Sequence, residues 1–301
     1  MGMNKARIPG KISVIMSVYN AEKTVELAIR STLLALPKNA ELLILLNGCN
    51  DGTERIVAAI SDTRLTTVIS QKTLAADERL NLLLQTSSGE FVGRMDADDI
   101  CLPWRFRYQK FFLARGGYDF IFANAILFGK SNGRPLMKVQ PPVRLTAEQC
   151  SMALVFSNPL VHPTMLARHS SLIDLRGYRD VPADDLDLWL RATLANKKIH
   201  RLSGYGILYR VHDGQLTQAS DWQMRHEHSG VVPELRRQLR EHLSETRPLK
   251  LLRGAPLTLG QTFVTSSIQV MIQFLGFKRM IRLLTTRRII SYPSEPWHDV
   301  S

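Results

Sequence analysis

Short apolar runs alternate with stretches of helical pattern over the first hundred residues of the chain. Four of the runs have the length and composition of buried strands, at residues 12–18, 41–46, 66–70 and 91–95. Three stretches between them have the pattern of helices, at residues 21–36, 53–60 and 74–86. Apolar strands that alternate with helices are typical of a mainly parallel sheet covered on both faces. We therefore predict an α/β fold.

The pattern changes after residue 100. Residues 101–218 combine short helices and strands, with helices predicted at 103–113, 147–156 and 185–196. From residue 219 onward the chain has a helical and basic pattern, without a strong strand signal. These changes divide the chain into three parts, residues 1–100, 101–218 and 219–301.

The last part contains an uncharged stretch, residues 255–277, that is long enough to cross a bilayer. Glutamine, serine and threonine residues interrupt it, which argues against a spanning helix. Basic and apolar residues are interleaved directly after it, up to residue 290. Two interpretations stay open: a helix on an anionic membrane surface, or helices that pack on the domain with a solvated basic face.

The net charge of +12 favours polyanionic partners such as phosphorylated ligands or anionic lipid. Aromatic residues are not interleaved with the basic ones as in RNA-binding motifs, so we expect no nucleic-acid partner. The three cysteines suggest no disulfide framework, which fits a reducing compartment and a cytoplasmic protein. The sequence lacks the dinucleotide-binding, P-loop, HExxH and GxSxG signatures, which argues against those enzyme classes.

Three loops follow the predicted parallel strands at their carboxyl ends, where such sheets bind ligands. They comprise residues 19–20, 47–51 and 96–99, and the last of them contains Asp96, Asp98 and Asp99. Carboxylates this close repel one another unless a cation lies among them, and hard divalent cations prefer oxygen ligands. The cluster therefore favours a metal site that also binds phosphate. The alternative is a solvated turn in which Asp99 caps the next helix.

A second acidic group, Asp184 and Asp185, lies at the start of the helix predicted at 185–196. Acidic residues are favourable at a helix start, so capping explains them without a further role. A carboxylate in a ligand site can also accept a proton from a hydroxyl group. The residues alone leave both interpretations open.

Six segments occur in an order that resembles bacterial family 2 glycosyltransferases of the GT-A fold. They are ISVIMSVYNAEKTVELAIRS, NGCNDGT, GEFVGRMDADDICLPWRFRYQ, NPLVHPTMLAR, RGYRDVPADDLDLWLRA and LYRVHDGQLT, spanning residues 11–218. The resemblance implies a mainly parallel central sheet flanked by helices, with a helical C-terminal extension. It assigns residues 1–100 to the nucleotide-sugar half of the GT-A domain, 101–218 to the acceptor half and 219–301 to the extension.

The resemblance implies that the loops after the first two strands hold the nucleoside. Ser17, Tyr19 and Asn20 match the Pro-x-Tyr-Asn stretch of the family, with Ser17 in place of the proline. They would hold the nucleobase and ribose. Asn47 stands where the family usually has an aspartate that reads the base. An amide both donates and accepts hydrogen bonds, so base recognition can differ here.

The DxD motif of the family matches Asp96, Ala97 and Asp98. By this resemblance Asp98 binds Mn²⁺ or Mg²⁺ on the donor diphosphate, and Asp96 contacts the ribose or assists the metal. Arg210 and His212 match the YRxH segment of the family and are candidates for contact with the diphosphate or the metal. An ordinary half-buried histidine at a strand end is the alternative for His212.

The Glu-Asp pair of the family matches Asp184 and Asp185. The resemblance makes Asp185 the catalytic base of an inverting enzyme, with Asp184 in the place of the glutamate. His162 and Trp189 are the candidates for contact with the acceptor. For His162 the alternative is a structural turn between two prolines, and for Trp189 it is a place in the core.

Taken together, these features predict an inverting glycosyltransferase that depends on Mn²⁺ or Mg²⁺. We expect it to move a sugar from a nucleotide-sugar, with UDP as the expected nucleotide, to a saccharide acceptor. A lipid-linked acceptor in capsule or O-antigen synthesis, and peripheral contact with the inner face of the cytoplasmic membrane, fit the basic C-terminal part. The alternative is a catalytically degenerate nucleotide- or saccharide-binding module. Asn47 suggests it, and the retained acidic groups argue against it.

Overall fold

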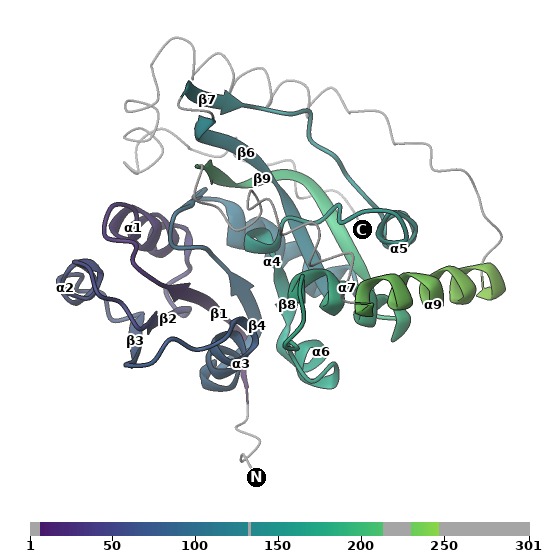
Figure 1. Cartoon of the computed structure of the whole chain (residues 1–301), viewed down its shortest axis with the longest axis horizontal. Coiled ribbons are helices and arrows are strands. Elements are labelled where there is room, and N and C mark those ends of the chain that lie inside the picture. The colour runs from purple at the N-terminus through teal and green to yellow at the C-terminus, as the bar shows by residue number, and fades with distance from the viewer. Residues whose placement is uncertain (1–6, 132–133, 213–229, 247–301) are drawn as a thin grey trace. The chain divides into compact units, whose positions relative to one another are not determined.

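The computed structural model describes residues 7–131, 134–212 and 230–246 (Figure 1). These residues belong to one compact unit, Met1–Leu257. The predictions about the uncharged stretch 255–277 and the basic residues after it lie outside the described residues. Within the described ranges, each helix is too short or too polar to cross a membrane.

A nine-stranded mixed sheet forms the centre of the described structure. Its strands are β1 (Ile8–Val18), β2 (Glu41–Asn47), β3 (Leu65–Ser70), β4 (Gly89–Arg94), β5 (Ile100–Cys101), β6 (Phe120–Ser131), β7 (Arg134–Lys138), β8 (Leu166–Arg168) and β9 (Ile199–Val211). The strand order is β3-β2-β1-β4-β8-β6-β9-β5, and β7 pairs with β6. All four strands predicted in the first hundred residues are present.

The predicted parallel arrangement holds for the first half of the sheet. The strands β3, β2, β1 and β4 are parallel to one another. Beyond β4 the sheet is mixed, because β8 pairs antiparallel with both β4 and β6. The pair β6–β9 is again parallel, and β9–β5 and β6–β7 are antiparallel.

Eight α-helices and one 3-10 turn lie in the described ranges. They are α1 (Val25–Ala35), α2 (Thr53–Ala58), α3 (Ala76–Thr86), α4 (Arg105–Arg115), α5 (Ala147–Leu154), the 3-10 turn (His162–Thr164), α6 (His169–Asp174), α7 (Asp184–Leu194) and α9 (Val231–Thr246). All six helices predicted before residue 219 are present, with ends shifted by at most four residues.

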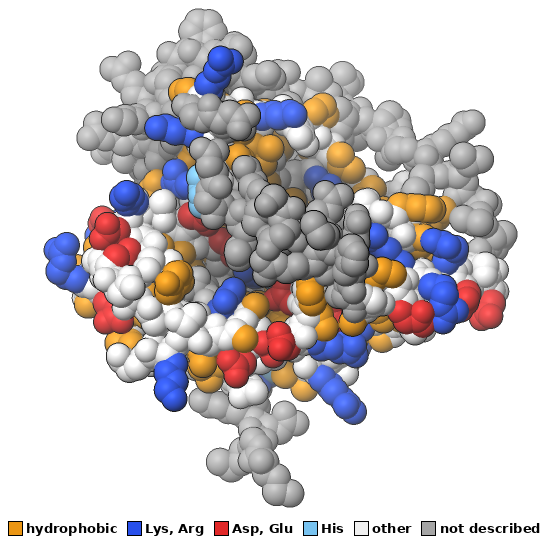
Figure 2. Space-filling model, viewed as in Figure 1, with side chains coloured by type: hydrophobic (Ala, Val, Ile, Leu, Met, Phe, Trp, Pro, Cys, Tyr) orange, Lys and Arg blue, Asp and Glu red, His pale blue; other side chains and the backbone are white. Residues whose placement is uncertain are grey.

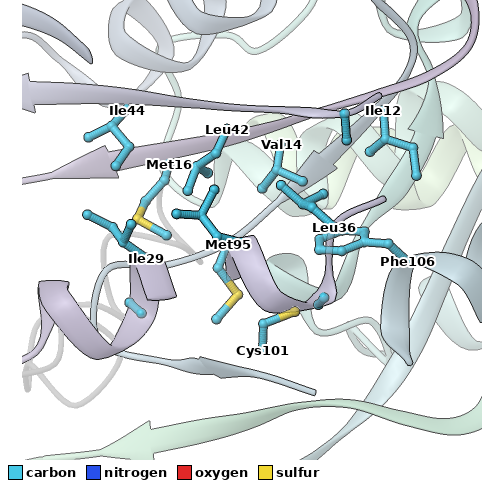
Figure 3. Packing of buried hydrophobic residues seen from close by; sticks show 14 of the residues in the cluster. Ile12, Val14, Met16, Ile29, Leu36, Leu42, Ile44, Met95, Cys101 and Phe106 are labelled. Carbon is cyan, nitrogen blue, oxygen red and sulfur yellow. The ribbon is translucent and has the colours of Figure 1, made fainter. Parts of the chain in front are cut away.

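The central strand β1 is buried on both faces, as its mainly apolar sequence predicts. Val14 and Met16 pack with Ile29 of α1 in the core on one face of the sheet (Figure 3). Ile15 lies in the core on the opposite face, which also contains Leu83 of α3. Each fully buried side chain of this size contributes about 1.5–3 kcal/mol to folding. Because β1 packs into a core on each face, its pairing register with β2 and β4 is fixed. The loop that follows β1 therefore has a defined position.

The helix α9 covers part of the core with one side and faces solvent with the other. Val232 and Leu239 are buried in the same core as Leu83. On the exposed side Arg237 forms ion pairs with Glu234 and Glu241, and basic and acidic side chains alternate along the helix (Figure 2). This helix confirms the predicted helical character for residues 231–246 of the C-terminal part.

Candidate functional site

The carboxyl ends of β1, β2 and β4 lie at one edge of the sheet, because these strands are parallel neighbours. The loops after β1 and β2 are joined by a pair of asparagines. Asn20 Nδ2 donates to Asn50 Oδ1 at 2.7 Å, and the backbone N–H of Asn50 donates to Asn20 Oδ1 at 2.9 Å. Next to this pair Tyr19 is 56% exposed, and Ser17 is half-buried. The ring of Tyr19 is therefore accessible to a ligand.

Asn47 lies at the same edge but is almost fully buried. Its Oδ1 accepts from the backbone N–H of Leu74 at 2.8 Å, and its Nδ2 donates to the backbone oxygen of Leu74 at 3.2 Å. The two bonds fix the start of the segment that leads to α3. They occupy one donor and one acceptor of the amide on which the expected base contact depends. The observed role of Asn47 is thus structural, and base recognition by this residue stays a prediction.

Asp96, Asp98 and Asp99 form a tight cluster after β4. Ligand oxygens of the three carboxylates all lie within 4.8 Å of one another. Asp99 is buried, and its Oδ1 accepts from the backbone N–H of Arg210 at 2.8 Å. Its Oδ2 is buried without a hydrogen-bond partner among the described residues. The structure therefore rejects the alternative in which Asp99 is a solvated helix cap. Ala97 is half-buried between the acidic residues and packs against the core.

The end of β9 brings Arg210 and His212 to this cluster, as the sequence predicts. Arg210 Nε donates to the backbone oxygen of Asp98 at 2.7 Å. His212 Nε2 lies 3.3 Å from Asp98 Oδ2. Neither contact follows from sequence spacing, because the two segments meet only through the antiparallel pairing of β5 with β9.

The cluster has the chemistry of a divalent-cation site. Burial and the charge of Asp96 raise the pKa of the Asp98 carboxyl, and the same causes raise the pKa of Asp99 well above its usual value. A cation that binds these oxygens would relieve the repulsion and give the buried Asp99 Oδ2 a partner. An all-oxygen set suits Mg²⁺ or Mn²⁺. The residues therefore fit a metal of this class.

Arg94 links the acidic cluster to the other side of the site, and the sequence analysis assigned it no role. Its side chain is largely buried, and Nη2 donates to Asp96 Oδ1 at 2.9 Å. Its Nη1 lies 2.8 Å from His162 Nε2. Burial disfavours the charged guanidinium, but the charges of Asp96, Asp184 and Asp185 outweigh it and raise the pKa of Arg94. One guanidinium thus lies between the two acidic groups.

His162 lies between Arg94 and a tyrosine. The hydroxyl of Tyr178 is 2.9 Å from His162 Nε2. Burial, together with the charge of Arg94, lowers the pKa of His162 well below its usual value. The ring is therefore neutral and has one acceptor nitrogen, which faces the Arg94 guanidinium, a group that can only donate. In this structure His162 is half-buried beside Arg94 at the start of the 3-10 turn, and its contact with the acceptor stays a prediction.

Asp184 and Asp185 are the first two residues of α7, and the charges of both act on Arg94. The residue before the helix, Ala183, has a left-handed φ of 58°. Asp184 Oδ1 accepts from the backbone N–H of Asp185 at 3.0 Å. Asp185 Oδ2 accepts from Asn158 Nδ2 at 3.0 Å. Both carboxylates are half-buried, and burial raises the pKa of each.

A buried ion pair fixes α7 and the loop before it. Asp187 is fully buried and accepts from Arg191 Nε at 2.7 Å, with Arg179 at 3.6 Å. Arg191 also donates to the backbone oxygens of Leu175 and Gly177 at 2.6 and 2.9 Å. Asp187 therefore points away from Asp184 and Asp185, as its spacing on the helix predicts.

Trp189 is in the core and not at the surface of the site. Its side chain is fully buried and meets Phe120, Phe122 and His162 edge-on. A contact with the acceptor requires an exposed edge of the ring, and the structure leaves none. The acceptor role expected for Trp189 is therefore withdrawn in favour of the core position.

Arg79 of α3 is a further cation of the site that the sequence analysis missed. Partial burial and the charge of Arg94 lower its pKa, and the charges of Asp184 and Asp96 oppose this effect. Its guanidinium therefore acts on both acidic groups. No motif indicates a role for Arg79, because α3 has the pattern of an ordinary amphipathic helix. The hydrogen bond between Asn47 and the backbone N–H of Leu74 fixes the start of the segment before α3 and so helps to place Arg79 at the site.

An α/β sheet with acidic residues and cations at its carboxyl edge defines a site for a phosphorylated ligand. The family model for "Glycosyl transferase family 2" matches residues 13–172, which is just over half of the chain. The chain belongs to glycosyl transferase family 2 and is a glycosyltransferase by class. This agrees with the resemblance that the sequence motifs carry.

Individual relatives are similar over most of the described region. The putative glycosyltransferase EpsE of Bacillus subtilis (strain 168) is 31% identical over 192 residues, which cover 60% of this chain and 66% of EpsE. The O-antigen biosynthesis glycosyltransferase WbnJ of Escherichia coli is 28% identical over 213 residues, 69% of this chain and 82% of WbnJ. The chain thus spans just under two thirds of EpsE and a larger share of WbnJ.

The fold is similar to that of a solved glycosyltransferase structure. Residues 1–349 of Staphylococcus aureus TarS, crystallised in complex with UDP-GlcNAc, superimpose with a TM-score of 0.60. The match covers 88% of this chain and 73% of the TarS chain at 19% identity. At this identity the likeness concerns the fold, and it confirms the predicted GT-A class.

Proposed function

We propose that the protein is an inverting, divalent-metal-dependent glycosyltransferase that moves a sugar from a UDP-sugar to a saccharide acceptor. One observation carries the proposal: Arg94 donates to Asp96 of the three-carboxylate cluster and lies close enough to Asp184 and Asp185 to feel the charge of that second carboxylate pair. The first group suits a metal-bound diphosphate, and the second suits a general base. A glycosyltransferase needs the metal-bound diphosphate and the general base close to the same sugar.

The donor would bind along the loops after β1, β2 and β4. Asp98 and Asp99 would hold Mg²⁺ or Mn²⁺, which when bound offsets the charge of the departing diphosphate. Asp96, whose Oδ1 is held by Arg94, would meet the ribose. The exposed ring of Tyr19 would pack against the nucleobase. Arg210 donates its backbone N–H to Asp99 and its Nε–H to the backbone oxygen of Asp98. It would supply a positive charge beside the diphosphate.

Asp185 would accept the proton of the acceptor hydroxyl. A base works best when its pKa lies close to the working pH, and burial shifts the pKa of Asp185 upward in that direction. As the proton moves to Asp185, the acceptor oxygen attacks the anomeric carbon and the bond to the diphosphate breaks. A single displacement of this kind inverts the anomeric centre.

The acceptor class rests on relatives. One Escherichia coli relative, 30% identical over 113 residues, is described as UDP-Glc:alpha-D-GlcNAc-diphosphoundecaprenol beta-1,3-glucosyltransferase WfgD. WbnJ is described as acting in O-antigen biosynthesis. We extend this to a lipid-linked saccharide acceptor in surface-polysaccharide synthesis. In this proposal residues 1–100 bind the donor, residues 101–218 bind the acceptor, and the basic part from 219 onward contacts an anionic membrane.

Nucleotide binding tests the donor side of the proposal directly. Calorimetry with the full chain should detect UDP in the presence of Mn²⁺, with affinity lost on addition of EDTA. GDP, dTDP and CMP should bind at least about tenfold more weakly, which corresponds to about 1.4 kcal/mol of base recognition. Preference for another nucleotide would overturn the UDP assignment. No binding of any of the four would overturn the proposed function.

A further inference from the structure

The segment between α5 and the 3-10 turn brings one side chain to the proposed catalytic base. Asn158 Nδ2 donates to Asp185 Oδ2 at 3.0 Å. The oxygen of the same amide accepts from the backbone N–H of Leu160 at 3.2 Å. This second bond decides the orientation of the amide, because only its oxygen can accept from an N–H. The amino group therefore faces the carboxylate.

The backbone that carries Asn158 is itself held on both sides. The backbone oxygen of Pro159 accepts from Arg201 Nη1 of β9 at 2.8 Å. A few residues further on, His162 contacts Arg94 and Tyr178. A donor on such a fixed segment can orient a carboxylate that is only half-buried.

We propose that Asn158 is a positioning residue: it holds Asp185 Oδ2 and thereby leaves Oδ1 to receive the proton of the acceptor hydroxyl. The inference rests on the proposed function and deepens it, because it names how the base is oriented. The terminal torsion of an aspartate is broad and roughly two-fold, so a free carboxylate samples many orientations. One hydrogen bond to a fixed amide removes much of this freedom.

The groups that face Asp185 come from several elements. Burial raises its pKa, and the backbone N–H of Leu186, the charge of Arg94 on β4 and the hydrogen bond from Asn158 lower it. Asp184 is its neighbour on α7, and Tyr178 of the preceding loop lies close enough for the two groups to influence each other's charge state. Removal of Asn158 leaves the other groups in place. The acid limb of the rate profile should therefore move to higher pH.

Two variants distinguish the hydrogen bond to Asp185 from the bond to the Leu160 N–H, which supports the local turn. Asn158→Ala removes both, whereas Asn158→Asp keeps an oxygen for the Leu160 N–H and replaces the donor by a like charge. With UDP release measured on the most active of UDP-glucose, UDP-galactose and UDP-N-acetylglucosamine, we expect kcat to fall about tenfold in Asn158→Ala. The acid limb of the pH–rate profile should move up by about one pH unit in Asn158→Ala, and further up in Asn158→Asp. The KM for the donor should stay unchanged.

The exposed neighbour Ser157 provides the control, and Ser157→Ala should keep the wild-type rate and profile. If Asn158→Asp behaves like the wild type, Asn158 serves the turn alone and the proposal is wrong. An unshifted acid limb in both variants contradicts it equally. Loss of rate with a raised donor KM and an unshifted acid limb would indicate misfolding instead of positioning and also overturns it.

A measurement without substrate separates this inference from the proposed function. The hydrogen bond favours the ionised carboxylate, so Asn158→Ala should lower the melting temperature more at pH 8 than at pH 3, which lies below the raised pKa of Asp185. An equal decrease at both values would overturn the inference. If the wild type turns over no donor, the proposed function fails, while this comparison still decides whether Asn158 holds Asp185.

Discussion

Replacing Asp185 with asparagine is expected to lower the rate of sugar transfer roughly 1,000-fold while leaving nucleotide affinity unchanged. General-base catalysis contributes about 10²–10⁴-fold, and the amide of asparagine cannot accept the proton. The substitution keeps the shape of the side chain and an oxygen for the Asn158 amide. UDP affinity, measured by calorimetry with Mn²⁺, reports the donor side separately from the chemistry.

Asp174 offers a matched control on the exposed surface. Its carboxylate forms an ion pair with Lys197 at 2.6 Å and contacts no residue assigned to the site. Asp174→Asn should therefore transfer sugar at the wild-type rate. If Asp185→Asn retains more than about a tenth of that rate with donor bound, the base is another residue, and Asp184 becomes the first candidate.

Replacing Asp98 with asparagine is expected to remove most metal-dependent turnover, by about 10²–10³-fold, and to weaken UDP binding in Mn²⁺. The same substitution should leave the folded protein at least as stable in EDTA at pH 8. The reason is that burial and Asp96 raise the pKa of Asp98, so the ionised form costs free energy in the metal-free fold at pH values above that pKa.

The combination of lost turnover and retained stability distinguishes metal binding from misfolding. Asp62, which pairs with Arg64 at 2.7 Å in the loop before β3, is the control, and Asp62→Asn should keep its metal dependence. Asp98→Asn with wild-type turnover in Mn²⁺ would contradict the metal assignment. A large decrease in melting temperature in EDTA would show that Asp98 is mainly structural.

The parallel half of the sheet was predictable because its central strands β1 and β2 are apolar on both faces. The burial of Val14 and Ile15 on opposite sides of β1 is what a mainly apolar run implies. The parallel order of β2, β1 and β4 then placed three loops at one edge, and the structure confirms this arrangement. The family resemblance made Arg210 and His212 candidates for contact with the diphosphate or the metal, and the structure places both beside Asp98.

The bounds of the long strands β6 and β9 were not predicted, and for β9 the reason is that two glycines interrupt its pattern. β9 contains Gly204 and Gly206, and glycines weaken a strand signal. A Cβ at Gly204 would lie 2.6 Å from the ring of Tyr108, and one at Gly206 would lie 2.9 Å from Ala123 Cβ. Glycine is therefore required by close approach, which the sequence does not reveal.

The centre of the site was also beyond sequence reasoning. Arg94 was visible beside the acidic cluster, but its contact with His162 depends on the packing of β4 next to β8. Tyr178 comes from a loop that Arg191 holds, and Asn158 comes from a segment that Arg201 holds. Asn47 matched a motif position, yet its bonds to the backbone are local to this fold.

The most direct test is turnover of nucleotide-sugars by the full chain. The protein is incubated with UDP-, GDP-, dTDP- and CMP-sugars in Mn²⁺ or Mg²⁺, with undecaprenyl-diphosphate-linked N-acetylglucosamine as acceptor, and nucleotide release is measured with and without EDTA. The account predicts release from one UDP-sugar that stops with EDTA and falls roughly 1,000-fold in Asp185→Asn. Release that persists in EDTA, or that is unaffected by Asp185→Asn, would contradict it.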